Sequence, residues 1–76
     1  MLEVKIHSAH ETLYEGRVTC CIFPGEQGVF EVRSFHQPIL SRLLTGQILI
    51  DGQPISIHRG IVKVEFDRVT ALVERA

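Results

Sequence analysis

Apolar and polar residues alternate along most of the chain with a period of two, which is typical of strands that have one buried face. The positions that share a face in these runs are Leu2, Val4, Ile6, Val18, Cys20, Ile22, Val62, Val64, Phe66, Val69, Ala71 and Val73. Those that we expect to form one buried core are Leu2, Val4, Ile6, Val18, Ile22, Val62, Val64 and Phe66. Alternating runs of this kind usually belong to two sheets that pack face to face.

Turn signals divide these runs about every 8–12 residues, a spacing typical of sandwiches and barrels. The strand before Pro24-Gly25 is expected to stop there, and Asp51-Gly52 predicts a tight hairpin turn because this dipeptide tolerates positive φ angles. A shorter turn is expected at Asp67-Arg68. Only "PILSRLL", residues 38–44, has a weak helical signal. The pattern therefore predicts an all-β fold, a flattened sandwich or barrel of two antiparallel sheets.

Length and composition limit the chain to one small domain, residues 1–76, which hides only about 60% of its unfolded surface. Eight Lys and Arg are scattered among nine Asp and Glu, so there is no basic face for nucleic acid. No apolar run approaches the roughly 20 residues of a membrane span. The N-terminus alternates and is not a signal peptide. We therefore expect a soluble intracellular protein.

Reactive residues do not form a recognisable catalytic pattern. Cys20 and Cys21 are adjacent, so on a strand one faces the core and the other faces away, both reduced. Four histidines lack the converging spacing of a zinc site; they are His7, His10, His36 and His58. The serines lack a nucleophile-elbow context, and "GEQGVFE" lacks the spacing of a phosphate loop. We expect no catalytic residue, no metal and no cofactor.

Five short motifs, taken in order, resemble a known family. They are "LYEG" at 13–16, "FPGEQGVFEV" at 23–32, "FHQPILSRL" at 35–43, "GQILIDG" at 46–52 and "RGIVKVEFDRVTALVERA" at 59–76. The series resembles the N-terminal β-sandwich domain of the ATP synthase epsilon chain over the whole chain. The resemblance implies two five-stranded sheets, about ten short strands in all.

The resemblance also implies a function. Members of this family are non-catalytic rotor subunits at the foot of the central stalk of a proton-translocating F-type ATP synthase. They bind the gamma chain and the ring of c subunits, and they couple ion-driven rotation to ATP synthesis. By the same resemblance the protein would be peripheral, on the cytoplasmic face of the bacterial inner membrane, and membrane-associated only through the complex.

The resemblance also implies contact residues on two turns that lie at one end of the sandwich. The residues implied for the c ring are Glu26, Gln27, Gly28 and Val29. Those implied for the gamma chain are Ser8, Phe35, His36, Pro38 and Ser41. The chain departs from the family pattern at several of these places. Val29 stands where an acidic residue is common, and Glu31 and Phe35 stand where glycine is common.

Two further expectations concern what surrounds this domain. Family members commonly continue into a pair of C-terminal helices, and the chain is expected to be a single β-sandwich without that helical domain. An alternative function is a stand-alone β-sandwich adaptor that uses the same turns for another protein. A third alternative, a small metal- or ligand-dependent enzyme, rests only on the histidines.

Overall fold

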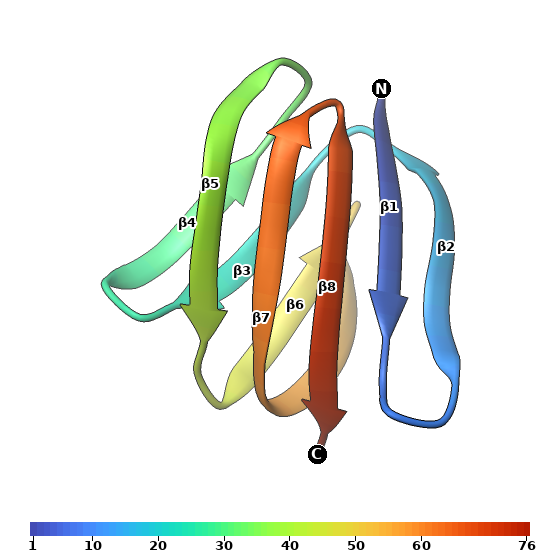
Figure 1. The fold of residues 1–76 in the computed structure, drawn as a ribbon, viewed down its shortest axis with the longest axis vertical. Helices are drawn as coiled ribbons and strands as arrows, with labels where there is room; N and C mark the ends of the chain where they lie inside the picture. The colour runs from blue at the N-terminus through green and yellow to red at the C-terminus, as the bar shows by residue number, and fades with distance from the viewer.

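The computed structural model describes all of residues 1–76, which form eight strands and no helix. The strands are β1 (Leu2–His7), β2 (Thr12–Val18), β3 (Cys21–Gly25), β4 (Gly28–Val32), β5 (His36–Leu43), β6 (Gly46–Ile50), β7 (Gln53–Phe66) and β8 (Arg68–Arg75). They lie in two layers (Figure 1), with β5, β7, β8, β1 and β2 in front and β4, β3 and β6 behind. The all-β sandwich predicted from the alternation is confirmed, with a strand count close to the one implied.

Hydrogen bonding joins the two layers into one continuous path of strands, β2-β1-β8-β7-β5-β3-β4, with β6 pairing with β3 and β7. The pair β1 and β8 is parallel, and the other pairs are antiparallel. The long strand β7 belongs to both layers, since its first part pairs with β6 and its last part with β5 and β8. Its register against β8 shifts between Ile57 and Arg59. At Gly60 a Cβ would lie 2.7 Å from the Leu72 carbonyl oxygen, so only glycine fits this close approach.

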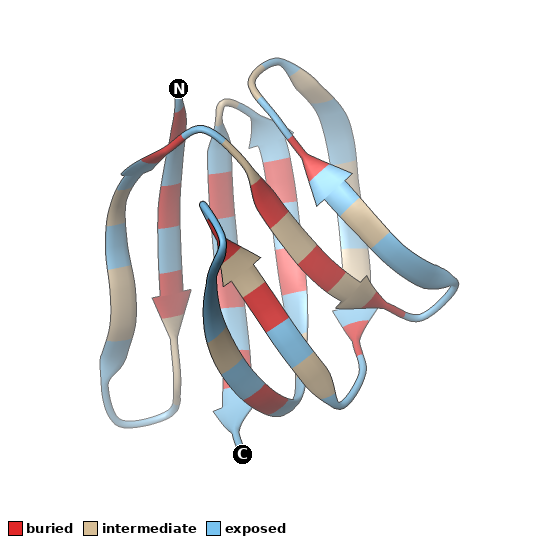
Figure 2. Ribbon diagram, turned by 180° about the vertical axis from the view of Figure 1, so that it is seen from behind, coloured by how far each residue is buried: buried red, intermediate tan, exposed pale blue.

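The core lies between the layers and contains no polar side chain. Figure 2 shows buried and exposed residues alternating along the strands. The buried residues are Leu2, Val4, Ile6, Val18, Cys21, Phe23, Val32, Leu43, Ile48, Ile50, Ile57, Val62, Val64, Val69, Ala71 and Val73. The inward faces predicted for the first strand and for the last two are therefore confirmed, except at Phe66.

The predicted core position Ile22 is wrong by one residue, because the buried residues of this strand are Cys21 and Phe23. The chain is interrupted between β2 and β3, where an Asp51 carboxylate oxygen accepts hydrogen bonds from the Thr19 amide (3.1 Å) and the Cys20 amide (2.9 Å). A one-residue shift in a strand exchanges its two faces. Of the two adjacent cysteines, Cys21 lies in the core and Cys20 lies outside it, as expected for neighbours on a strand.

Phe66 is the second correction, because it was expected in the core and is 60% exposed. The last inward pair of the β7–β8 hairpin is Val64 with Val69. The hairpin then closes through Phe66 and Asp67, with Phe66 at φ 50°. By alternation, Phe66 would be the next inward residue after Val64. It belongs to the turn instead, so its side chain is exposed.

The weak helical prediction for residues 38–44 is wrong, because β5 occupies this segment. Its register shifts between His36 and Ile39, and Pro38 lies in this irregularity. A proline is tolerated there because no ladder hydrogen bond is required of it. The Asp51-Gly52 turn is confirmed, with φ 46° and 84°. Strand β3 runs through Pro24-Gly25, so the next turn falls on Glu26 and Gln27 instead.

Candidate functional site

The loop implied for the c ring projects from a rigid base at the β3–β4 turn. Glu26 and Gln27 form the turn, and Val29 is 74% exposed although it belongs to a strand. Beneath the loop, the Phe30 ring stacks on the buried Phe23 ring with centroids 5.6 Å apart. A Cβ at Gly25 would lie 2.7 Å from the Phe30 ring, so glycine makes room for this stacking. The loop is therefore exposed at its tip and fixed at its base.

Two adjoining hollows connect this loop with two of the residues implied for the gamma chain. The loop hollow, about 590 Å³, is lined by the loop and by Ser41 of β5. The sheet hollow, about 900 Å³, extends from Glu26 across β5, β7 and β8 to Ser8 in the β1–β2 loop. Arg42 and Ile61 line both hollows. The structure thus brings Ser8, Ser41 and the loop to one continuous surface.

The floor of this surface carries exposed apolar side chains on the outer face of the front sheet. Arg42, Ile61 and Leu72 are cross-strand neighbours in one row of β5, β7 and β8. Leu40 and Leu44 flank Arg42 on the same face, since alternate residues of a strand point to the same side, and both are exposed. Grouped exposed apolar residues of this kind mark interaction sites.

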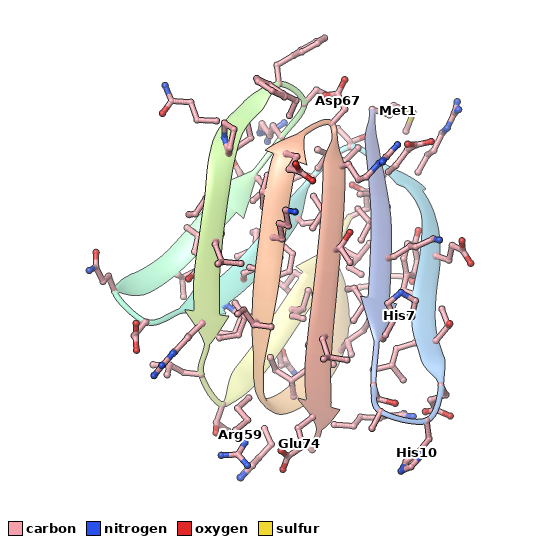
Figure 3. All side chains as sticks on the ribbon, viewed as in Figure 1. Met1, His7, His10, Arg59, Asp67 and Glu74 are labelled. Carbon is pink, nitrogen blue, oxygen red and sulfur yellow. The ribbon has the colours of Figure 1, made fainter.

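Two of the charged groups on this surface, one cation and one carboxylate, lack partners within the chain. The other seven Lys and Arg side chains form ion pairs, which leaves Arg42 as the unpaired cation. Glu26 is the corresponding carboxylate, because the other eight acidic side chains accept an ion pair or a hydrogen bond. One satisfied pair is Arg59 with Glu74, whose Nε and Oε2 atoms are 2.9 Å apart. Both side chains lie at the lower end of the front sheet in Figure 3. Arg42 and Glu26 are both free to pair with another molecule.

The other residues implied for the gamma chain lie elsewhere. Phe35 is in the turn between β4 and β5, and His36 and Pro38 begin β5. This turn and the Glu26-Gln27 turn lie at opposite ends of β4 (Figure 1), so the expectation that both turns share one end of the sandwich is wrong. The physical reason is that the residues between the turns form a complete strand paired with β3.

At this second end, Asp67 holds two turns together. Its carboxylate accepts a hydrogen bond from the Phe35 amide (2.8 Å), and its carbonyl accepts one from the Glu3 amide (2.7 Å). His36 is half-buried, with Nδ1 2.7 Å from the Gln37 carbonyl oxygen. Phe66 pairs with His36 across β5 and β7. Sequence reasoning missed Phe66 as a surface residue, and its place beside the expected Asp67-Arg68 turn was the one signal that could have revealed it.

The titratable side chains do not assemble into a reactive centre. Burial, followed by the hydrogen bond to Glu31, raises the pKa of the Cys20 thiol, and burial raises that of Cys21 to about 12. Hydrogen bonds from Arg33 first and from Cys20 second lower the pKa of the Glu31 carboxyl. Both thiols are therefore protonated and poorly nucleophilic at neutral pH. No three His, Cys, Asp or Glu side chains are grouped so as to hold a metal ion.

The structure contains no helix capable of crossing a bilayer. The features that remain are two surfaces: the adjoining hollows around Arg42, and the turns that Asp67 holds at the opposite end of β5. Exposed apolar groups, unpaired charges and a rigid base suit these surfaces to binding another protein.

Comparison with known proteins connects the whole chain with one family. Residues 1–76 match the family model described as "ATP synthase, Delta/Epsilon chain, beta-sandwich domain". The chain is 39% identical over 80 aligned positions to an ATP synthase epsilon chain of Nitratiruptor sp., covering 99% of this chain and 62% of that relative. An epsilon chain of Neisseria meningitidis is 27% identical, with 100% and 59% covered. The chain therefore spans about six tenths of these relatives' length.

A solved structure has a similar fold. A chain in the cryo-EM structure of the Tetrahymena thermophila mitochondrial ATP synthase central stalk and c ring superposes with a TM-score of 0.80. The superposition covers 96% of this chain and 63% of that one, at 12% sequence identity. At that identity the similarity shows a shared fold.

Proposed function

The chain belongs to the ATP synthase delta/epsilon chain β-sandwich family, and from this premise we propose that it is a non-catalytic rotor subunit of a proton-translocating F-type ATP synthase. In this role it binds the gamma chain and the c ring, and it passes ion-driven rotation toward the catalytic head. It works at the cytoplasmic face of a bacterial inner membrane, held there by the complex. It carries no catalytic residue of its own.

The observation that carries this proposal is the surface formed by the two adjoining hollows. The residues that the family resemblance implies for the c ring, Glu26, Gln27, Gly28 and Val29, line the loop hollow together with Ser41, which is implied for the gamma chain. Glu26 also lines the sheet hollow with Ser8, another residue implied for the gamma chain. Because both sets of residues belong to one rigid domain, a force applied by one partner is passed to the other.

The remaining gamma-chain contact residues, Phe35, His36 and Pro38, are consistent with a partner that lies along β5. His36 begins this strand and Ser41 lies near its end. One edge of β5 pairs with β7, whereas the other edge pairs with β3 only at Leu43. An elongated element of the gamma chain along this open edge reaches both groups of residues. We propose that the gamma chain binds in this way.

A titration of the purified gamma chain from the same organism with this domain tests the proposal. Wild-type domain should bind, and Arg42→Glu should weaken binding by about tenfold, as expected for an interfacial charge that loses its partner. The matched control is Lys5→Glu, which makes the same charge change on β1, at an exposed residue outside both hollows. The proposal fails if folded wild-type domain does not bind the gamma chain.

The c-ring contact is tested separately with purified c ring in detergent. Glu26→Lys should weaken binding at low salt, and the difference from wild type should shrink as the salt concentration rises, because exposed charges are screened. The same variant should melt like wild type, since Glu26 is exposed and without partners in the chain. If wild type and Glu26→Lys bind the c ring equally well at low salt, Glu26 is not part of the c-ring contact.

A further inference from the structure

Two exposed phenylalanines adopt backbone angles that their side chains disfavour. Phe35 has φ 61° and Phe66 has φ 50°, and they are 78% and 60% exposed. Bulky L residues are strained in this left-handed region, which favours glycine, asparagine and aspartate. The third non-glycine residue there is Asp51, which is of a favoured type. Neither phenylalanine gains burial in the core in exchange for its strain.

The two residues lie side by side at one end of the sandwich. His36, the residue after Phe35, is the cross-strand partner of Phe66. Asp67, the residue after Phe66, accepts the hydrogen bond from the Phe35 amide. Figure 3 shows Asp67 at the end of the β7–β8 hairpin, near Met1. Because one aspartate ties both turns, the two phenylalanines are presented from a single rigid support, which we call the aromatic tip.

Strained backbone that the surrounding structure holds in place is concentrated at functional sites. We propose that the aromatic tip, Phe35 with Phe66, is an anchor that inserts into a concave apolar pocket of a protein partner. This inference rests on the proposed function, under which the partner is the gamma chain. The proposal adds Phe66 to the residues that contact the gamma chain. It also specifies that the ring of Phe35, and not only the backbone of its turn, makes the contact.

The surroundings of the tip favour a protein pocket over a lipid surface. Membrane docking of an aromatic tip is normally supported by a cluster of basic residues. Here the neighbouring charges are mixed: Glu3 pairs with Arg68 and Arg17 at 4.0 Å, and Asp67 lies between the two phenylalanines. Aromatic side chains are also the commonest energetic anchors of protein interfaces.

Because the backbone at both phenylalanines is strained, the proposal predicts variants that keep or gain stability while they lose affinity for the gamma chain. Asparagine tolerates positive φ, so Phe35→Asn and Phe66→Asn should relieve backbone strain while removing the ring. Each variant should therefore melt no lower than wild type and bind the gamma chain more weakly, by about tenfold. If a phenylalanine served only the stability of its own domain, its replacement by asparagine would lower the melting temperature. Gain of stability with loss of function is typical of residues kept for binding.

The experiment titrates purified gamma chain with wild-type domain and each variant, beside thermal melting of the same samples. Ser56→Asn is the control, because it introduces the same asparagine at an exposed residue of β7 that lines neither hollow and lies ten residues before Phe66 in the strand; its affinity for the gamma chain should stay within about threefold of wild type. Phe66→Trp, which keeps a ring, should retain more affinity than Phe66→Asn.

Three outcomes overturn the proposal, and they are distinguishable. If wild type binds the gamma chain and both asparagine variants bind within about threefold, the aromatic tip is not an anchor, although the proposed function stands. If wild type does not bind at all, the proposed function fails and the inference fails with it. If the tip variants lose flotation with vesicles of phosphatidylcholine and phosphatidylglycerol that wild type shows, the tip serves a lipid surface instead.

Discussion

Replacing Phe23 by alanine should lower the stability of this domain more than replacing Phe66 does. Alternation along the sequence indicates the reverse, because it predicts Phe66 as the core aromatic residue. Phe23 is fully buried and stacks on Phe30 at 5.6 Å between centroids. Truncation of a buried phenylalanine to alanine costs about 3–5 kcal/mol, because the lost burial is followed by an incompletely filled cavity. The cost of Phe23→Ala should lie at the upper end of this range, because the stacked pair of rings is also lost. Such pairs contribute about 0.5–1.5 kcal/mol beyond the burial of their area.

The loss caused by Phe23→Ala is large compared with the total free energy of unfolding expected for this domain. At roughly 0.05–0.15 kcal/mol per residue, 76 residues correspond to about 4–11 kcal/mol. For domains of this size each kcal/mol lowers Tm by about 4–8 °C, so Phe23→Ala should lower Tm by at least about 12 °C. Phe66→Ala should stay within about 0.5 kcal/mol of wild type, because the exposed ring contributes little to the core.

The assay is urea unfolding of both variants, followed by circular dichroism and checked by thermal melting. Equal slopes against urea would show that the variants unfold from the same compact state. The reasoning is refuted if Phe23→Ala melts within a few degrees of wild type, or if Phe66→Ala loses as much stability as Phe23→Ala.

Two further predictions concern the interrupted segment between β2 and β3. Asp51→Ala should cost about 2–3 kcal/mol, because two backbone amides lose a charged acceptor, whereas Asp51→Asn keeps an acceptor oxygen and should cost less than half as much; equal urea midpoints for these variants would remove Asp51 from this role. Burial holds the pKa of the folded Cys21 thiol at about 12, above its ordinary 9.0, so the unfolded chain loses this proton first. Stability from the protonated thiol is complete below pH 9.0 and is lost as pH rises toward about 12, so Cys21→Ala should show a shallower decline over that window. Parallel declines of Cys21→Ala and wild type in urea titrations at several pH values would contradict this reading.

Alternation predicted the fold wherever a strand has one buried face and no interruption. Leu2, Val4 and Ile6 are buried as their spacing indicates, and so are Val62 and Val64. In the resemblance to the epsilon chain the order of motifs carried the information, because each motif alone is short. Alternation and motif order were therefore sufficient for the fold class and the family.

Two of the failures lie where residues far apart in sequence are in contact, and a local pattern contains no information on such contacts. Asp51 lies more than thirty positions from Thr19 in sequence, yet its carboxylate accepts a hydrogen bond from the Thr19 amide at the point where the alternation is interrupted. Asp67 binds the Phe35 amide across a similar separation and fixes both turns of the aromatic tip. The sequence placed Phe35 on the surface, but the partnership of Phe35 with Phe66 depends on contacts that no local pattern contains.

The most direct test of the rotor-subunit assignment is recovery of this chain, carrying an affinity tag, from membranes of the organism that encodes it, after mild detergent extraction. The account predicts that the gamma chain and the c subunits are recovered together with it. It also predicts that Arg42→Glu combined with Phe35→Asn reduces recovery of the gamma chain while the tagged domain stays folded. Recovery of the folded wild-type chain with neither the gamma chain nor the c subunits would contradict the account.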